Sequence, residues 1–228
     1  MASYDKIDLG RSYIERTGSR LESEFIGEVD KDQYDDLAYE FLHRDEIAKA
    51  KSAISDPNKR FEYQLKLKDS AKAEFKNNMD LWHQRYKVSE RAAIKLVEQS
   101  QRSNPEKPTK FFTANLYNYM RKRFGPGISL KFFTSTGGTH LDAAYGIDCF
   151  FKIYNEESGQ ELAIATIDLT GRERKDSTKA KVLLNINKDD RDKYDPSGED
   201  YDKKFFDAKV GEFSEIIIDA LLEDNAKR

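Results

Sequence analysis

The sequence has little cysteine and histidine, which limits the chemistry that it can support. Cys149 is the single cysteine, so no internal disulfide can form, and a thiolate zinc site would require several more. The three histidines form no cluster of the kind that binds zinc. We therefore expect neither redox chemistry nor a structural zinc site.

Long apolar runs are also missing. No stretch approaches the roughly 20 apolar residues that would span a bilayer, and the first residues lack the pattern of a signal peptide. Charged residues make up 36% of the chain and apolar residues 38%. We expect a soluble, cytoplasmic protein that does not bind membranes. The net charge of -3 argues against coating of nucleic acid by bulk charge, so such contacts must come from local patches.

Several catalytic motifs are absent. There is no Gly-x-Ser-x-Gly sequence and no Cys-His pair with supporting spacing. Gly137-Gly138-Thr139 and Thr170-Gly171-Arg172 are too short to cradle a phosphate, and neither leads into a predicted helix. These absences exclude the nucleotide-binding loop and the common nucleophilic hydrolase sites.

The first half of the chain has a helical composition. Residues 30–101 are rich in Lys, Glu, Ala and Leu, with one proline. A helix is predicted over about residues 58–86, and Ser89 is a candidate N-cap for a helix that ends near Gln99. The stripe of the first helix, which we expect to pack on another helix, comprises Phe61, Leu65, Phe75, Met79, Trp82 and Tyr86. Residues 101–110 contain two prolines and no large apolar side chain, which indicates a boundary between residues 1–104 and 105–228.

In the second half of the chain, the spacing of the apolar residues changes from that of helices to that of strands. Residues 111–124 predict a helix that Gly125, Pro126 and Gly127 end. Strands are predicted at 128–134, 147–154, 161–170 and 181–186, then a loop at 187–204 and a helix at 205–222. This order indicates an α+β or α/β fold class, with an N-terminal helical region followed by a small mixed-sheet α/β domain.

Two of the predicted strands each carry one acid, Asp148 and Asp168, in an otherwise apolar run. A buried carboxylate is costly unless it is paired, hydrogen-bonded or bound to a cation. If the strands pair and both acids face the same way, their carboxylates converge and could hold magnesium or manganese. Alternatively, they cap turns or pair with Arg172 or a lysine at the strand ends.

These residues carry a resemblance to a known family. Gly146-Ile147-Asp148 opening one strand, and Ile167-Asp168-Leu169-Thr170 ending the next, resemble the active-site half of the PD-(D/E)XK nucleases. The resemblance implies that Asp148 and Asp168 bind the catalytic metal. It also implies a lysine where this chain has Thr170. The residues that could supply this charge instead are Lys181, Arg172, Lys175 and Lys179. Asp142, or His140 beside it, could contact the metal or a substrate phosphate.

A basic cluster could contact nucleic acid. Arg121, Lys122 and Arg123 lie near the end of the predicted helix 111–124, and Lys110 lies near its start. Basic residues at a helix C-terminus also complement the helix dipole. If this helix lies beside the metal site, their charge would offset that of a phosphate backbone.

The sequence therefore predicts a magnesium-dependent endo- or exodeoxyribonuclease that hydrolyses phosphodiester bonds in DNA. The N-terminal helices would recognise DNA or a protein partner, and a dimer could cut both strands. The alternative is a catalytically inactive, nuclease-like binding or assembly protein, which Thr170 favours. A small, highly charged protein of this kind would suit a phage or a mobile element, acting in the host cytoplasm.

Overall fold

The computed structural model describes residues 19–77, 88–171 and 178–228. Within these ranges the chain combines helices with one four-stranded mixed sheet, which confirms the mixed α/β class. The helices are α2 (Ser19–Phe25), α3 (Lys31–Leu42), α4 (Arg44–Ala53), α5 (Pro57–Asn77), α7 (Glu90–Gln99), α8 (Phe111–Arg123), α9 (His140–Tyr145) and α10 (Lys203–Ala226), with a 3-10 helix, η1, at Lys188–Tyr194. The strands are β1 (Ile128–Thr134), β2 (Cys149–Asn155), β3 (Glu161–Thr170) and β4 (Val182–Asn185).

The strands lie side by side in chain order, β1-β2-β3-β4. The first three are antiparallel neighbours, whereas β4 runs parallel to β3. The Asn155 side chain orders the β2–β3 turn by accepting hydrogen bonds from the backbone N–H groups of Glu157 and Ser158. All four strands overlap the predicted ranges, because β-branched and aromatic side chains fill both faces of a buried sheet.

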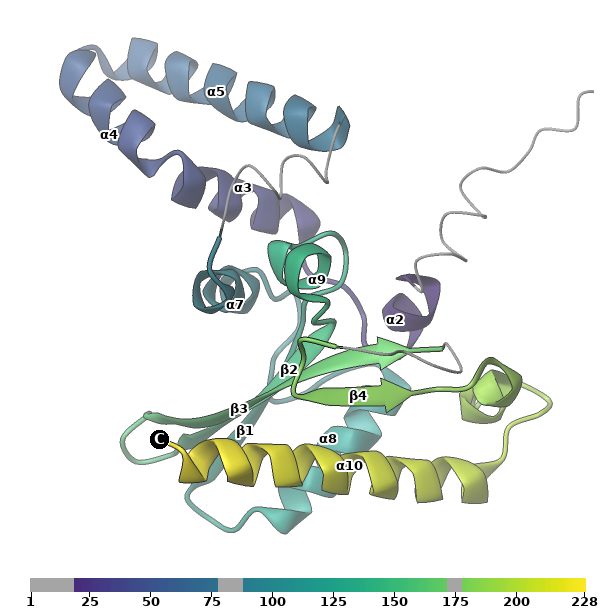
Figure 1. Cartoon of the computed structure of the whole chain (residues 1–228). Coiled ribbons are helices and arrows are strands. Elements are labelled where there is room, and N and C mark those ends of the chain that lie inside the picture. Colours follow the sequence, from purple (N-terminus) through teal and green to yellow (C-terminus); the bar gives the residue numbers. More distant parts are fainter. Residues whose placement is uncertain (1–18, 78–87, 172–177) are drawn as a thin grey trace, which may run out of the picture.

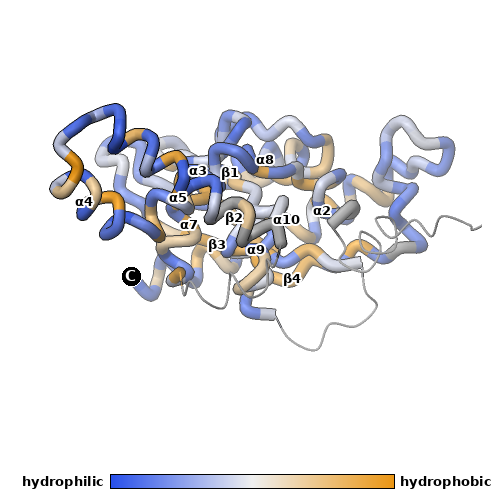
Figure 2. The backbone as a smooth tube through the Cα atoms, turned by 90° about the horizontal axis from the view of Figure 1, so that it is seen from above, coloured by the Kyte–Doolittle hydropathy of each residue, from blue (hydrophilic) through white to orange (hydrophobic). Residues whose placement is uncertain are grey.

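Helices cover both faces of the sheet (Figure 1). One face packs on α8 and α10, through alternating β3 residues such as Ala165 and Ile167. The other packs on α3, α7 and α9, through Phe133, Phe150 and Ile164. Figure 2 shows the hydrophobic residues gathered along β3 and β4. The sheet is therefore the central layer, and successive strand residues belong to different cores.

The N-terminal helices share a core with the sheet, which differs from the predicted division at residue 104. Tyr34 of α3 and Val97 of α7 are buried in the same cluster as Phe150 of β2. The segment predicted to be a boundary is also fixed. The Gln101 side-chain amide donates to the Thr134 carbonyl at 2.8 Å and accepts from its N–H at 3.2 Å.

Helices α4 and α5 form an arm that projects beyond α3, away from the sheet (Figure 1). The prediction that Phe61 and Leu65 pack on another helix is wrong for the described chain, because their side chains are 66% and 46% exposed. The α5 helix is described to Asn77. Met79, Trp82 and Tyr86 of the predicted stripe lie outside the described residues, as does the side chain of Phe75.

The local capping signals explain two helices near the site. Ser89 caps α7 as predicted, accepting from the Ala92 N–H at 3.3 Å. The short α9 was not predicted. Thr139 caps its start, and Gly146 ends it in the left-handed conformation, with φ of 61°. Among the described helices, none is long and apolar enough to cross a membrane.

Candidate functional site

The two predicted acids lie next to each other on neighbouring strands. The regular antiparallel pairing of β2 with β3 ends at Cys149 and Ile167, and just before β2 the Asp148 N–H donates to the Ile167 carbonyl at 2.9 Å. Asp168 is four strand residues from Ile164 and so faces the core that contains α7 and α9, and its charge acts on Asp148. The two side chains are 4% and 3% exposed. The predicted hairpin therefore brings the two acids close to each other.

Each of these carboxylates is oriented by a hydrogen bond. The Leu169 N–H donates to Asp148 Oδ2 at 2.7 Å, and the Thr178 hydroxyl donates to Asp168 Oδ2 at 2.8 Å. The Asp148 backbone is also fixed, because its carbonyl accepts from the Ser135 N–H at 2.8 Å. The pair is therefore held by backbone from both neighbouring strands and by the segment that leads into β4.

Asp142 is a third acid at this edge of the sheet. It lies in the first turn of α9, where its N–H donates to the Thr139 hydroxyl. Burial raises the pKa of Asp142 to about 6, with a further rise from the negative charge of Asp168, against a lowering hydrogen bond from the Gly138 N–H. The three predicted metal ligands, Asp142, Asp148 and Asp168, therefore lie at the same edge of the sheet.

Glu22 of α2 is a fourth acid, and the sequence did not single it out. Its side chain is 8% exposed, and its charge acts on Asp148. The chain after α2 is tied to the end of β1, because the Gly27 carbonyl accepts from the hydroxyls of Thr134 and Thr136. A single glutamate in a short amphipathic helix carries no spacing signal toward residues more than a hundred positions away, so only the tertiary structure reveals it.

The four carboxyl groups at this edge act on one another electrostatically. Burial raises the pKa of Asp148 well above its usual range, and the nearby charges of Glu22, Asp142 and Asp168 raise it further, while the Leu169 hydrogen bond lowers it. Such a cluster is costly without a cation, and its oxygen donors are the kind that magnesium and manganese take. As they stand, however, no three acidic, histidine or cysteine side chains within the described ranges are grouped closely enough to hold an ion. A magnesium ion would therefore be held by one or two carboxylates, with water completing its coordination shell, as is common for this ion.

His140 has a structural contact rather than an open position in a loop. It is 1% exposed, its backbone N–H donates to the Tyr34 hydroxyl at 2.8 Å, and its ring Nδ1 lies 2.9 Å from the same oxygen. Burial raises the pKa of Tyr34 above its ordinary value. The pair fastens α3 to the start of α9.

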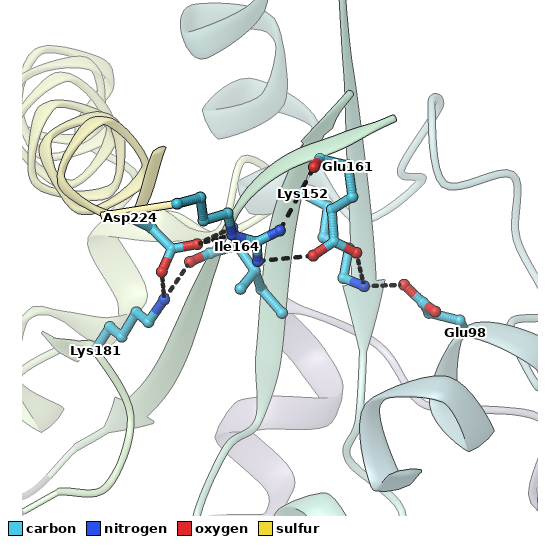
Figure 3. Close-up of polar contacts among 7 residues, drawn as sticks. Glu98, Lys152, Glu161, Ile164, Lys181 and Asp224 are labelled. Carbon is cyan, nitrogen blue, oxygen red and sulfur yellow. Dashed lines mark hydrogen bonds and ion pairs between the residues drawn. The ribbon is translucent and has the colours of Figure 1, made fainter. Parts of the chain in front are cut away.

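Lys181 does not lie with the acids, which corrects its predicted catalytic role. Its ammonium donates to the Ile164 carbonyl at 2.9 Å and forms an ion pair with Asp224 of α10 (Figure 3). Ile164 precedes Asp168 by four strand residues, roughly 13 Å along β3. The ion pair with α10 therefore holds this ammonium away from the carboxylates.

Lys181 belongs to a chain of ion pairs at the opposite end of the sheet (Figure 3). Its most buried member is Lys152, which is 5% exposed and lies 2.5 Å from Glu98 and 2.6 Å from Glu161. Glu161 continues to Arg228 at 2.8 Å, which also pairs with Asp224. Although burial alone would raise the pKa of Glu161, Lys152 and Arg228 together lower it. This chain joins α7, β2, β3 and α10.

Thr170, where the resemblance implies a lysine, is buried on β3. Arg172 and Lys175, two of the predicted substitutes, lie outside the described residues. Lys179 follows Thr178, which binds Asp168, and its ammonium donates to the Ala144 carbonyl at 2.8 Å. Lys179 is therefore a predicted substitute that the structure describes and places at the acidic edge.

The predicted nucleic-acid contacts are divided between the two ends of α8. Arg121 lies 3.4 Å from Glu156 after β2, and Arg123 lies 2.5 Å from Glu215 of α10. With Lys122, they lie near the start of β1, roughly 20 Å along that strand from its acidic end, and α8 packs on the other face of the sheet. The structure therefore separates this cluster from the acids.

Lys110, at the N-terminus of α8, lies toward the acidic edge. It is exposed and shares a small cavity with Gly27 and Thr134, the residues that tie α2 to β1. Among the four predicted nucleic-acid contacts, it is the one that the fold keeps at this end of the sheet.

No protein-family model, curated protein or solved structure matches the chain. The properties of the site therefore rest on its own geometry.

Proposed function

We propose that the protein is a metal-dependent nuclease that hydrolyses DNA phosphodiester bonds at the edge formed by Asp148 and Asp168. The observation that carries the proposal is the position of these two buried carboxylates, close together where the pairing of β2 and β3 ends, with Asp142 and Glu22 acting on the same edge. Buried like charges are maintained in proteins mainly where a cation or a reaction uses them.

Asp148 and Asp168 would hold magnesium or manganese, with water completing the coordination shell. The ion, when bound, lowers the pKa of a coordinated water and stabilises negative charge on a phosphate. The Leu169 N–H and the Thr178 hydroxyl fix the orientation of the two aspartates before substrate arrives. Lys110 and Lys179 would supply positive charge for the phosphate backbone on either side of the site.

The assay that tests this proposal is cleavage of supercoiled and linear plasmid DNA and of single-stranded DNA in magnesium, manganese or chelator. Asp148→Asn and Asp168→Asn preserve the shape of each side chain while removing its charge, so both should lose cleavage by a factor of a hundred or more, on the order of a lost catalytic group. Asp219→Asn, an exposed position on α10, is the matched control and should cleave like the unmodified chain. Lys179→Ala should lower the rate less than either aspartate variant.

A second function is favoured by a specific observation. Thr170 stands at the lysine position, and the described side chains include no group of three that could hold an ion as they stand. A nuclease-like protein that binds nucleic acid or assembles without cutting would have these properties. Folded protein that cuts neither DNA nor RNA in either metal, and that binds neither metal, would replace the nuclease proposal with this one.

A further inference from the structure

The groove between α3, α4 and α5 is an interaction surface on the projecting arm (Figure 1). It has a volume of about 540 Å³. Tyr39 and Ile47 line one wall, and Phe61 and Leu65 of α5 line the other. Phe61, at 66% exposure, is the most exposed large apolar side chain of the described residues. An apolar groove on an element that projects from the core is typical of a docking site.

The charges along this groove are not mixed at random. On the α3 side, toward the sheet, it carries Asp36 and Glu40, whereas on α4, toward the tip of the arm, it carries Arg44 and Lys51. Lys68 of α5 is paired with Asp36 at 2.5 Å. The groove is therefore acidic at its base, apart from that ion pair, and basic at its tip.

The spacing of the groove-lining residues is also regular. Arg44, Ile47 and Lys51 follow one another on α4 at intervals of three and four residues and so share one face of that helix, and Glu40 precedes them on α3, before the break at His43. These four residues form a seam along the groove. The midpoint of this seam lies between Arg44 and Ile47. A seam with opposite charges at its two ends is complementary to itself when it is reversed.

We propose that this groove binds the same groove of a second copy of the chain, with the two arms antiparallel about a two-fold axis between Arg44 and Ile47. This arrangement places Glu40 opposite the partner's Lys51, and Arg44 opposite the partner's Ile47. A parallel arrangement would place Lys51 against the partner's Lys51, so charge selects the antiparallel one. Figure 2 shows the arm at one end of the molecule, so reversed arms leave the two sheets on opposite sides of the contact.

A second copy fits the groove better than nucleic acid does. The basic residues Arg44 and Lys51 are confined to the tip, and Asp36 at the base is paired with Lys68. Glu40 at the base would repel a phosphate backbone, and Leu65 offers no stacking face. The inference is independent of the nuclease proposal, because none of Glu22, Asp142, Asp148 or Asp168 lines the groove. Either proposal can fail without the other.

Sedimentation velocity over a range of concentrations, in chelator, tests the dimer. The full chain should approach twice the 26.4 kDa of one protomer. Phe61→Ser with Leu65→Ser should give monomers, and both side chains are exposed, so the protomer should remain folded by circular dichroism. Lys59→Glu, an exposed change on α5 outside the groove, is the control and should leave the dimer intact.

Exchange of charge distinguishes the antiparallel seam from unspecific association. Glu40→Lys and Lys51→Glu should each raise the dimer dissociation constant about tenfold or more, because each sets like charges opposite each other. The two changes in one chain restore opposite charges and should restore the dimer. A full chain that stays monomeric at its solubility limit would overturn the proposal, as would groove variants that remain dimeric or a double variant as weak as the single ones. Loss of binding to a labelled DNA duplex in the serine variants, without a change in oligomeric state, would also overturn the proposal.

Discussion

Replacement of Asp142 by asparagine should stabilise the protein at neutral pH when no divalent cation is present. The pKa of this carboxyl is raised from 3.8 to about 6 by burial and by the charge of Asp168. Because the folded pKa is higher than the unfolded one, the folded state holds a proton that the unfolded state has released between about pH 4 and pH 6. Stability therefore falls as pH rises through this window, and the whole penalty is present above it.

The size of the effect follows from the shift. About two pKa units at 1.36 kcal/mol each amount to about 3 kcal/mol. The carboxylate also gains about 0.3–1 kcal/mol in the first turn of α9, which asparagine loses. Asp142→Asn should thus raise the free energy of unfolding by about 2 kcal/mol at pH 8 and change it little at pH 4.

Urea unfolding followed by circular dichroism, in chelator at pH 4, 6 and 8, measures this difference. Equal slopes of free energy against urea for the two proteins would show that the same surface unfolds in both. Asp219→Asn is the control for loss of an exposed charge and should show no pH-dependent gain. A stabilisation that is the same at pH 4 and pH 8, or a loss of stability at pH 8, would refute the electrostatic account of the site.

Two further predictions concern parts of the fold away from the carboxylates. Lys152→Ala leaves Glu98 and Glu161 without the cation that they share. The free energy of unfolding, measured in urea at pH 8, should fall by about 3 kcal/mol or more. A fall below about 1 kcal/mol would mean that the ion-pair chain does not stabilise the fold. Gly146→Ala forces an alanine into the left-handed conformation that ends α9 and should cost about 1 kcal/mol. Gly125→Ala, at a glycine with open space around it and no positive φ, should cost less, and equal losses at the two positions would contradict this explanation.

The strands of the sheet were predictable because their own residues favour the strand conformation. The run from Glu161 to Thr170 is apolar on both faces, and the turn at Ser158-Gly159 fixes its antiparallel pairing with β2. The register at the far end of the hairpin does not follow from the turn, because an irregularity between Ile153 and Tyr154 shifts the pairing by one residue. The strands and their pairing could therefore be derived from the sequence, whereas the meeting of Asp148 and Asp168 depends on the folded backbone.

The remaining parts depend on packing between distant segments. Glu22 reaches the site because it lies on α2. The chain just after α2 is held in place by a hydrogen bond to the end of β1. The direction of the Lys181 side chain depends on Asp224, which α10 presents from the other end of the chain. The exposure of Phe61 depends on what α5 packs against, which its helical periodicity does not specify.

The central claim is that the carboxylates of this edge hold a divalent cation, and calorimetric titration of the protein with manganese tests it most directly. The proposal predicts saturable binding by the full chain, loss of that binding in Asp148→Asn and in Asp168→Asn, and unchanged binding in Asp219→Asn. Absence of manganese and magnesium binding by folded protein, or binding that survives both site variants, would contradict it.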